Sequence, residues 1–250
     1  MVDHFESALD PELVAVLQQL PVLDDPQLDA LGVQQRSLEM IEAMRDRLPK
    51  PVDDPAVATE DFYVGEGGNP LRIRLYTPQK SLRTTPLPAL LWIHSGGFIL
   101  GNIESEDSLC QQLCKQADCV VASVEYRLAP QHPYPAALDD CYLGLAWLTQ
   151  SCDQLAIDPN RIAVGGSSAG GCLAAAVALR ARDENGPRLA MQILVIPALD
   201  DRCETPSSHA VTDPRIWNRS LSVKTWAAYL AEVSGQVPAY AAPARATTSR

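Results

Sequence analysis

The sequence lacks both an apolar run long enough to cross a bilayer and an excess of positive charge. Its longest apolar runs, residues 193–197 and 172–179, are far shorter than the roughly 20 residues that a membrane-spanning helix needs. Lysine and arginine together number 20, against 31 aspartate and glutamate residues, so the formal net charge is -11 at pH 7. An acidic surface of this kind repels phosphate backbones. We therefore expect neither a membrane span nor a nucleic-acid partner.

Signals for export and for a bound cofactor are missing as well. The acidic start MVDHFESALDPELV has neither the basic residues nor the small-residue cleavage site of a signal peptide. The seven cysteines are scattered through apolar or helical segments, which is typical of buried, reduced thiols. Cys110 and Cys114 are four residues apart, but two thiols without further ligands make a weak metal site. We expect a cytoplasmic protein with no metal and no organic cofactor.

Two helical patterns, each with an apolar stripe, open the chain. The stripes consist of Leu13, Val16, Leu17 and Leu20 in the first pattern and of Leu38, Ile41, Met44 and Leu48 in the second. Asp10 and Pro11 offer the first helix an N-cap and a first-turn proline. Neither pattern carries chemistry, and we expect both helices to cover another part of the protein.

The central part of the chain alternates strands and helices. Residues 71–76 (LRIRLY) alternate apolar and basic side chains, as a half-exposed edge strand does. Four continuously apolar runs follow, which is typical of strands buried on both faces, with helical patterns between them. The predicted strands are 89–93, 119–124, 162–166 and 191–196, and the predicted helices are 107–117, 136–150, 169–182 and 222–233. The alternation predicts an α/β fold with a mainly parallel sheet and helices on both faces.

The sharpest chemical signal is the segment Gly166-Ser167-Ser168-Ala169-Gly170, which matches the pattern G-x-S-x-G. It follows a predicted buried strand directly and opens a helix of small residues. A strand-to-helix elbow needs glycines on either side of the serine, because larger side chains would clash in so tight a turn. The elbow lifts the Ser168 hydroxyl above the carboxyl edge of the sheet, beside the positive end of the helix. The pattern predicts Ser168 as a nucleophile, with a glycine-rich packing turn as the alternative.

A second glycine-containing segment, HSGGF at 94–98, comes directly after the predicted strand 89–93. An acyl-transfer serine needs backbone N–H groups aimed at the oxyanion of its tetrahedral intermediate, and glycines let the backbone come that close. We predict Gly96, Gly97 and Ala169 as the donors of an oxyanion hole. His94 is predicted to support this turn structurally. A plain loop is the alternative.

Together, these segments resemble the hormone-sensitive-lipase family of bacterial esterases, also called family IV. The matching segments are 94–97 (HSGG), 126–130 (YRLAP), 135–140 (PAALDD), 166–171 (GSSAGG) and 241–246. The likeness covers nearly the whole chain. It implies an α/β-hydrolase fold, a serine carboxylesterase and a small-molecule ester substrate with a short acyl chain. Ser95 stands where the family usually has a first glycine, and Ser167 stands where it usually has aspartate.

The resemblance also implies a division of the chain. It assigns residues 1–50 to N-terminal cap helices, 51–202 to the α/β-hydrolase core, 203–235 to a second part of the cap, and 236–250 to a truncated return to the core. The family places its catalytic acid after a seventh strand and its histidine after an eighth. This chain ends where the seventh strand should begin. The resemblance therefore implies a C-terminally truncated sheet that lacks the last two strands.

Only four histidines are present: His4, His94, His132 and His209. Just one of them, His209, follows Ser168; the resemblance assigns it to the cap, with Asp213 too close in sequence to orient it. An unassisted serine hydroxyl is a poor nucleophile at neutral pH. We therefore expect impaired ester hydrolysis by this chain, slight or absent.

Two other functions stay open on the sequence. A catalytically silent module could bind a small acyl ligand on the same fold, and a serine hydrolase could cleave another bond, such as an amide, because the elbow and oxyanion hole serve all acyl transfers. Residues 191–196 should form an unprotected sheet edge. Such an edge predicts a homo-oligomer, because its unpaired backbone groups can pair with another chain.

Overall fold

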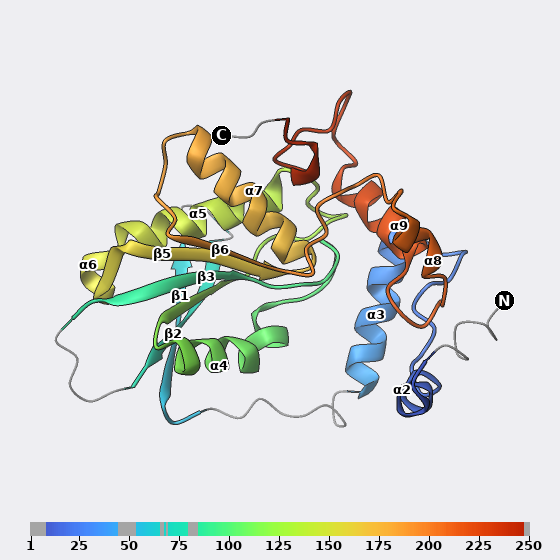
Figure 1. Ribbon diagram of the computed structural model, residues 1–250, viewed down its shortest axis with the longest axis horizontal. Coiled ribbons are helices and arrows are strands. Elements are labelled where there is room, and N and C mark those ends of the chain that lie inside the picture. The colour runs from blue at the N-terminus through green and yellow to red at the C-terminus, as the bar shows by residue number, and fades with distance from the viewer. Residues whose placement is uncertain (1–8, 45–53, 66–67, 69, 80–84, 248–250) are drawn as a thin grey trace. The chain divides into compact units, whose positions relative to one another are not determined.

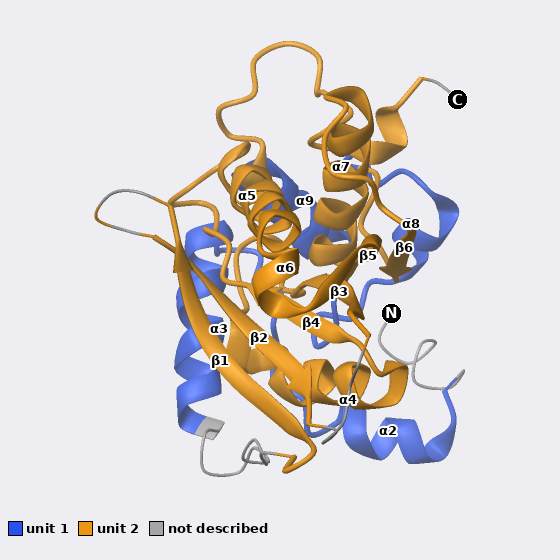
Figure 2. Ribbon diagram, turned by 90° about the vertical axis from the view of Figure 1, so that its left-hand side faces the viewer, with its two compact units in different colours: residues 1–48, 201–228 blue, residues 49–200, 229–250 orange. Residues whose placement is uncertain are grey.

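A computed structural model describes residues 9–44, 54–65, 68, 70–79 and 85–247. The chain divides into two compact units (Figure 2). The smaller unit combines residues 1–48 with 201–228, and the larger unit combines residues 49–200 with 229–250. Among the described helices, none has the length and apolar character that crossing a membrane requires.

The larger unit is built on a six-stranded sheet with the strand order β1-β2-β4-β3-β5-β6. Its strands are β1 (Val57–Val64), β2 (Leu71–Pro78), β3 (Leu87–Ile93), β4 (Val120–Val124), β5 (Ile157–Ser167) and β6 (Met191–Val195). The pairs β4–β3, β3–β5 and β5–β6 are parallel, whereas β2 pairs antiparallel with both β1 and β4. The prediction of a mainly parallel sheet is confirmed.

Helices cover both faces of this sheet (Figure 1). On one face lies α4 (Asp107–Ala117), and on the other lie α5 (Ala136–Gln150) and α7 (Ala169–Asp183). All three were predicted to within one residue. Shorter segments complete the unit: η1 (Ile103–Glu106), α6 (Cys152–Leu155) and η2 (Pro243–Arg245).

The predicted edge position of residues 71–76 is wrong, because β2 lies between β1 and β4. Its alternating arginines do not face open solvent. The guanidinium groups of Arg72 and Arg74 lie 2.8 and 2.7 Å from the carboxylate of Asp61 on β1. Sequence reasoning missed β1 itself, because its side chains are mostly exposed or half-buried and include charged residues that show no apolar run.

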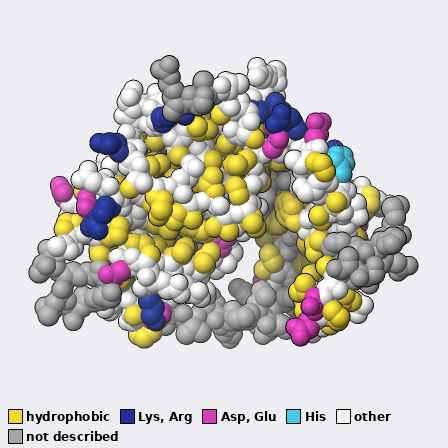
Figure 3. Space-filling view, viewed as in Figure 1, with side chains coloured by type: hydrophobic (Ala, Val, Ile, Leu, Met, Phe, Trp, Pro, Cys, Tyr) yellow, Lys and Arg dark blue, Asp and Glu magenta, His cyan; other side chains and the backbone are white. Residues whose placement is uncertain are grey.

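The opposite edge of the sheet is β6, as predicted, since this strand pairs with β5 alone. Met191 is 56% exposed, and Ile196 directly after the strand is 79% exposed. Hydrophobic side chains gather over the middle of the larger unit in the space-filling view (Figure 3). Association of two copies through this edge stays a prediction.

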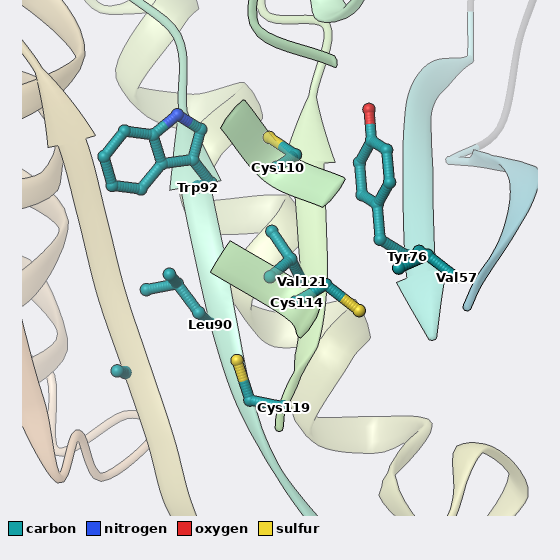
Figure 4. Close-up of a cluster of buried hydrophobic side chains, with 9 residues drawn as sticks. Val57, Tyr76, Leu90, Trp92, Cys110, Cys114, Cys119 and Val121 are labelled. Atoms are coloured by element: carbon teal, nitrogen blue, oxygen red, sulfur yellow. The ribbon is translucent and has the colours of Figure 1, made fainter. Parts of the chain in front are cut away.

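All seven cysteines are buried, and no disulfide joins any of them. Two of them, Cys110 and Cys114, lie on the inward face of α4, in a cluster with Leu90, Trp92 and Val121 of the sheet (Figure 4). Burial raises the pKa of the Cys110 thiol to about 12, so this group stays protonated at neutral pH. The spacing of four residues therefore places Cys110 and Cys114 together on the face of α4 that packs against the sheet.

The described part of the smaller unit contains four helices: α2 (Pro11–Leu17), α3 (Ala30–Met44), α8 (Pro206–Ala210) and α9 (Arg219–Tyr229), whose last residue belongs to the larger unit. Asp10 caps α2, as predicted, by accepting a hydrogen bond from the amide of Glu12. The helix predicted at 222–233 begins and ends earlier in the structure, and the short α8 was not predicted.

A polar network joins the segments of this unit. Asp24 accepts hydrogen bonds from Lys224 (2.9 Å), Ser220 (3.1 Å) and Asn218 (3.1 Å). Burial alone would raise the pKa of Asp24, but these three hydrogen bonds outweigh it and lower the pKa.

The predicted apolar stripe of α3 does not form the interior of the smaller unit. Leu38 and Ile41 are both more than half exposed, whereas Gln34 and Ser37 on the same helix are buried. The last residue of the predicted stripe, Leu48, lies outside the described residues. The inward face of α3 is thus more polar than its apolar periodicity suggests.

Candidate active site

The structure places Ser168 at the tight turn between β5 and α7. Its backbone has φ 53° and ψ −114°, a conformation that L-residues rarely adopt and that is typical of strained functional turns. A Cβ atom added at Gly166 would overlap the backbone of Gly170. The pair of flanking glycines is therefore a steric requirement of the turn.

Backbone hydrogen bonds hold this elbow. The Ser168 amide donates to the carbonyl of Val195 on β6 (2.9 Å), and the Ser168 carbonyl accepts from the amides of Cys172 and Ala198 (3.0 Å each). The Ser168 side chain is half-buried, and its Oγ makes no hydrogen bond with any described residue.

The turn after β3 adopts left-handed backbone conformations in succession. Gly96, Gly97 and Phe98 have φ values of 128°, 59° and 66°. A Cβ atom at Gly96 would overlap the carbonyl of Leu100, so only glycine fits there.

Two carbonyl groups of this turn, those of Ser95 and Gly96, accept hydrogen bonds from groups within the turn. The Ser95 carbonyl accepts from His94 Nδ1 (2.8 Å), and the Gly96 carbonyl accepts from the amides of Ile99 (3.1 Å) and Leu100 (2.9 Å). Because C=O and N–H point in opposite directions across a trans peptide, the next amides, those of Gly96 and Gly97, point away from these partners. Neither amide donates to a described residue.

His94 is fully buried beneath this turn. Its ring stacks on Tyr126 with 4.1 Å between centroids, and the Tyr126 hydroxyl donates to the His94 carbonyl (3.1 Å). Burial lowers the pKa of His94, so the imidazole is neutral at pH 7. Since a carbonyl only accepts, the proton lies on Nδ1, and Nε2 has no partner among the described residues.

The two turns meet at the carboxyl edge of the sheet. Ile93, the last residue of β3, is paired with Gly166 of β5. A Cβ atom at Gly170 would collide with the carbonyl oxygens of Ile93 and His94, so the first turn of α7 lies directly against the turn after β3. The Ala169 amide, at the start of α7, also donates to no described residue. The predicted residues Ser168, Gly96, Gly97 and Ala169 thus come from two turns in direct contact.

The other described histidines are not part of these turns. His132 is exposed in the larger unit, and its side chain makes no hydrogen bond to a described residue of that unit; His209 is exposed in the smaller unit. His4 lies outside the described residues. Asp213 is buried and pairs with Arg215 at 2.6 Å, and hydrogen bonds from Arg215 lower its pKa. Among the described residues of the larger unit, no imidazole is therefore in place as a base for Ser168.

Sequence reasoning missed three residues that support the turn after β3. The Glu106 carboxylate accepts from the Ser95 amide (2.8 Å) and from the indole Nε1 of Trp92 (2.6 Å). Tyr126 is the third, and its position in the matching segment 126–130 was a signal that could have found it. No sequence pattern pointed to Glu106 or Trp92, because their contacts join separate segments.

Comparison with known proteins identifies the lineage. A family model described as the alpha/beta hydrolase fold matches residues 90–250. The chain belongs to this α/β-hydrolase family. It is 36% identical to Esterase LipI of Mycobacterium tuberculosis over 96% of the chain and 72% of LipI. It is 34% identical to Carboxylesterase NlhH of the same species over 85% of the chain and 64% of NlhH.

Solved structures of α/β hydrolases agree with this assignment. A structure named Bacterial Heroin Esterase superposes with a TM-score of 0.84 and 40% sequence identity, covering 97% of this chain and 76% of that chain. The predicted α/β-hydrolase fold, the resemblance to hormone-sensitive-lipase-like esterases and the serine-hydrolase lineage are confirmed. These relatives support carboxylic ester hydrolysis as the chemistry of the family members. The chain spans less than two thirds of the length of NlhH.

Proposed function

We propose that this protein hydrolyses carboxylic esters of short acyl chains, with Ser168 as the nucleophile. The observation that carries the proposal is the contact between the elbow at Ser168 and the turn after β3. This contact places the Ser168 hydroxyl in the same region as the amides of Gly96, Gly97 and Ala169. None of these four groups makes a hydrogen bond to a described residue. The esterase relatives support an ester as the substrate, and the elbow itself would also serve amide cleavage.

The three amides are suited to an oxyanion hole. In acyl transfer, the carbonyl oxygen of the substrate becomes negatively charged as the serine oxygen attacks, and fixed N–H donors stabilise that charge. The carbonyls that precede Gly96 and Gly97 are held by hydrogen bonds, so these donors need little reorganisation. The Ala169 amide lies at the N-terminus of the 15-residue helix α7, where the helix dipole adds positive potential. His94 supports the turn from below and, being neutral and buried, does not act as the base.

Ester turnover by the 250-residue chain on its own should be low. No described imidazole of the larger unit is hydrogen-bonded to Ser168 Oγ. Loss of the base in a triad enzyme lowers kcat by roughly 10⁴ to 10⁶. The oxyanion hole alone retains about 10³ to 10⁴ of the rate enhancement over water. This arrangement also favours the second candidate, a module that binds a small acyl ligand without cleaving it.

The assignment of residues 1–50 and 203–235 to a cap, and the cytoplasmic location, stay predictions.

The decisive experiment is intact-mass analysis after incubation with a fluorophosphonate, alongside turnover of p-nitrophenyl butyrate. The variant Ser168→Ala removes the proposed nucleophile, and Ser167→Ala is the matched control, because it removes the neighbouring hydroxyl of the same turn. We expect one adduct that forms slowly on the wild type and on Ser167→Ala, because Ser168 lacks an assisting base, and no adduct on Ser168→Ala.

An adduct that persists in Ser168→Ala would refute the assignment of the nucleophile. Absence of any adduct, together with saturable binding of butyrate, would favour the binding module. Rapid turnover that depends on Ser168 would show that a base is present, and His209→Gln would then test the only described histidine after the nucleophile.

A further inference from the structure

We propose that Glu106 is the positioning residue of the oxyanion turn, acting through the Ser95 amide to hold the amides of Gly96 and Gly97 in place. This inference rests on the proposed function, because it concerns the donors that the proposal assigns. It assigns Glu106 no contact with the substrate.

The contacts of Glu106 are specific to the turn. One carboxylate oxygen accepts from the Ser95 amide at 2.8 Å, and the other accepts from the indole of Trp92 at 2.6 Å. Trp92 lies on β3 and is 2% exposed, so the indole is a fixed point within the sheet. The carboxylate therefore ties the beginning of the turn to the strand that precedes it.

The position of Glu106 in its own helix does not explain these contacts. Glu106 ends η1 and is the N-cap residue of α4, yet its side chain makes no capping hydrogen bond to that helix. Glutamate is not among the preferred N-cap residues either. The side chain instead turns toward β3, where the N-terminus of α4 still favours its negative charge.

The bond to Ser95 completes a continuous set of restraints. The peptide group between His94 and Ser95 is held at both ends, its carbonyl by Tyr126 and its N–H by Glu106. The next two carbonyls are held by His94 and by the amides of Ile99 and Leu100. Glu106 is the one acceptor in this set that comes from outside the turn, and its loss leaves the first peptide group held at its carbonyl alone.

The substitution Glu106→Gln tests this role with little change in shape. Glutamine has one oxygen in place of two, so it can accept from Ser95 or from Trp92, while its NH₂ group opposes the other donor. The matched control is Glu104→Gln. Glu104 lies two residues earlier on η1 and is bonded to Arg72 at 2.6 Å, with no contact to the turn.

The primary measurement is ¹⁵N relaxation of the backbone amides, which needs no catalytic activity. In the wild type we expect the Gly96 and Gly97 amides to have order parameters of about 0.85, the value of rigid backbone. In Glu106→Gln they should fall toward about 0.6, and the Ser95 amide and Trp92 indole protons should move upfield. Glu104→Gln should leave all these signals as in the wild type.

The fluorophosphonate reaction supplies a second measurement. Misplacement of oxyanion donors by a fraction of an ångström should slow labelling of Ser168 roughly 10-fold in Glu106→Gln, with no comparable change in the thermal midpoint. Trp92→Phe, which removes the other anchor of the carboxylate, should show an intermediate loss of order at Gly96 and Gly97.

Unchanged order parameters in Glu106→Gln would overturn the positioning role, and so would an equal loss in Glu104→Gln. A wild-type protein that does not react with the fluorophosphonate would count against the proposed function alone, because the relaxation result is obtained independently of labelling.

Discussion

The elbow at Ser168 and the turn after β3 lie in contact at the same edge of the sheet, but only the turn after β3 is held by side chains as well as by backbone. Backbone hydrogen bonds to Val195, Cys172 and Ala198 hold the elbow. Its glycines have no Cβ atom, which lets neighbouring backbone segments approach closely. The turn after β3 has backbone bonds too, from Ile99 and Leu100 to the Gly96 carbonyl, and the side chains of His94, Tyr126 and Glu106 hold it in addition. Both turns should therefore be sensitive to added atoms at their glycines, and the turn after β3 also to the removal of side-chain groups.

The largest effect should come from adding one methyl group to the elbow, in Gly170→Ala. The new Cβ would collide with the carbonyl oxygens of Ile93 and His94, which are backbone atoms at the end of β3 and cannot move aside independently. We expect the free energy of unfolding to fall by about 3 kcal/mol or more, measured by urea denaturation.

The control for this prediction is Gly68→Ala. A Cβ at Gly68 meets no atom within 4 Å, so its stability should stay close to that of the wild type. A Gly170→Ala protein as stable as this control would contradict the steric account of the elbow.

The next effect concerns His94 and pH. Since burial lowers the pKa of His94 in the folded protein, the unfolded chain binds an extra proton below its own pKa of about 6.5. The contribution of the neutral, buried His94 to the free energy of unfolding is fully present above about pH 6.5. It is lost as pH falls below that value, by up to about 1.4 kcal/mol for each pH unit. Denaturation curves between pH 5 and 8 measure this slope.

Two variants sharpen that measurement. His94→Gln should be less stable at pH 8 and should lose the part of the slope that His94 causes. His209→Gln, which changes an exposed histidine, should keep the wild-type slope. An unchanged slope in His94→Gln would show that other groups cause the pH dependence.

A smaller effect should follow from Tyr126→Phe. This substitution removes the hydroxyl that donates to the His94 carbonyl at 3.1 Å and leaves the aromatic stack in place. We expect a loss of about 1 kcal/mol in the free energy of unfolding, the usual value for one buried hydrogen bond. Tyr63→Phe, at a residue that is 66% exposed, is the control and should change stability little.

The smallest effect on stability should be that of Ser168→Ala. The Ser168 Oγ makes no hydrogen bond with a described residue, and the backbone bonds of the elbow do not depend on it. We expect a change below about 0.5 kcal/mol in calorimetry, although the variant should lose all fluorophosphonate labelling. A large loss of stability would show that the hydroxyl is part of what holds the elbow.

Much of the fold was accessible from the sequence because its signals are local. The apolar runs at 89–93, 119–124, 162–166 and 191–196 each became a strand of the parallel sheet, and α4 and α5 match their predicted ranges. Strand β1 was missed and β2 was misplaced for one reason. A charged strand is stabilised by its partner, here through Asp61 with Arg72 and Arg74, and periodicity within one segment does not show its neighbour.

The sequence by itself determined the turn at Ser168, the glycine turn after β3 and the α/β architecture that brings such turns to one edge, because tight turns and buried strands restrict residue types locally. Only the tertiary structure decided which amides stay without an acceptor, that His94 is buried and neutral, and that Glu106 and Tyr126 hold the turn. Those outcomes depend on hydrogen bonds and burial between segments far apart in the chain, and no local pattern records such contacts.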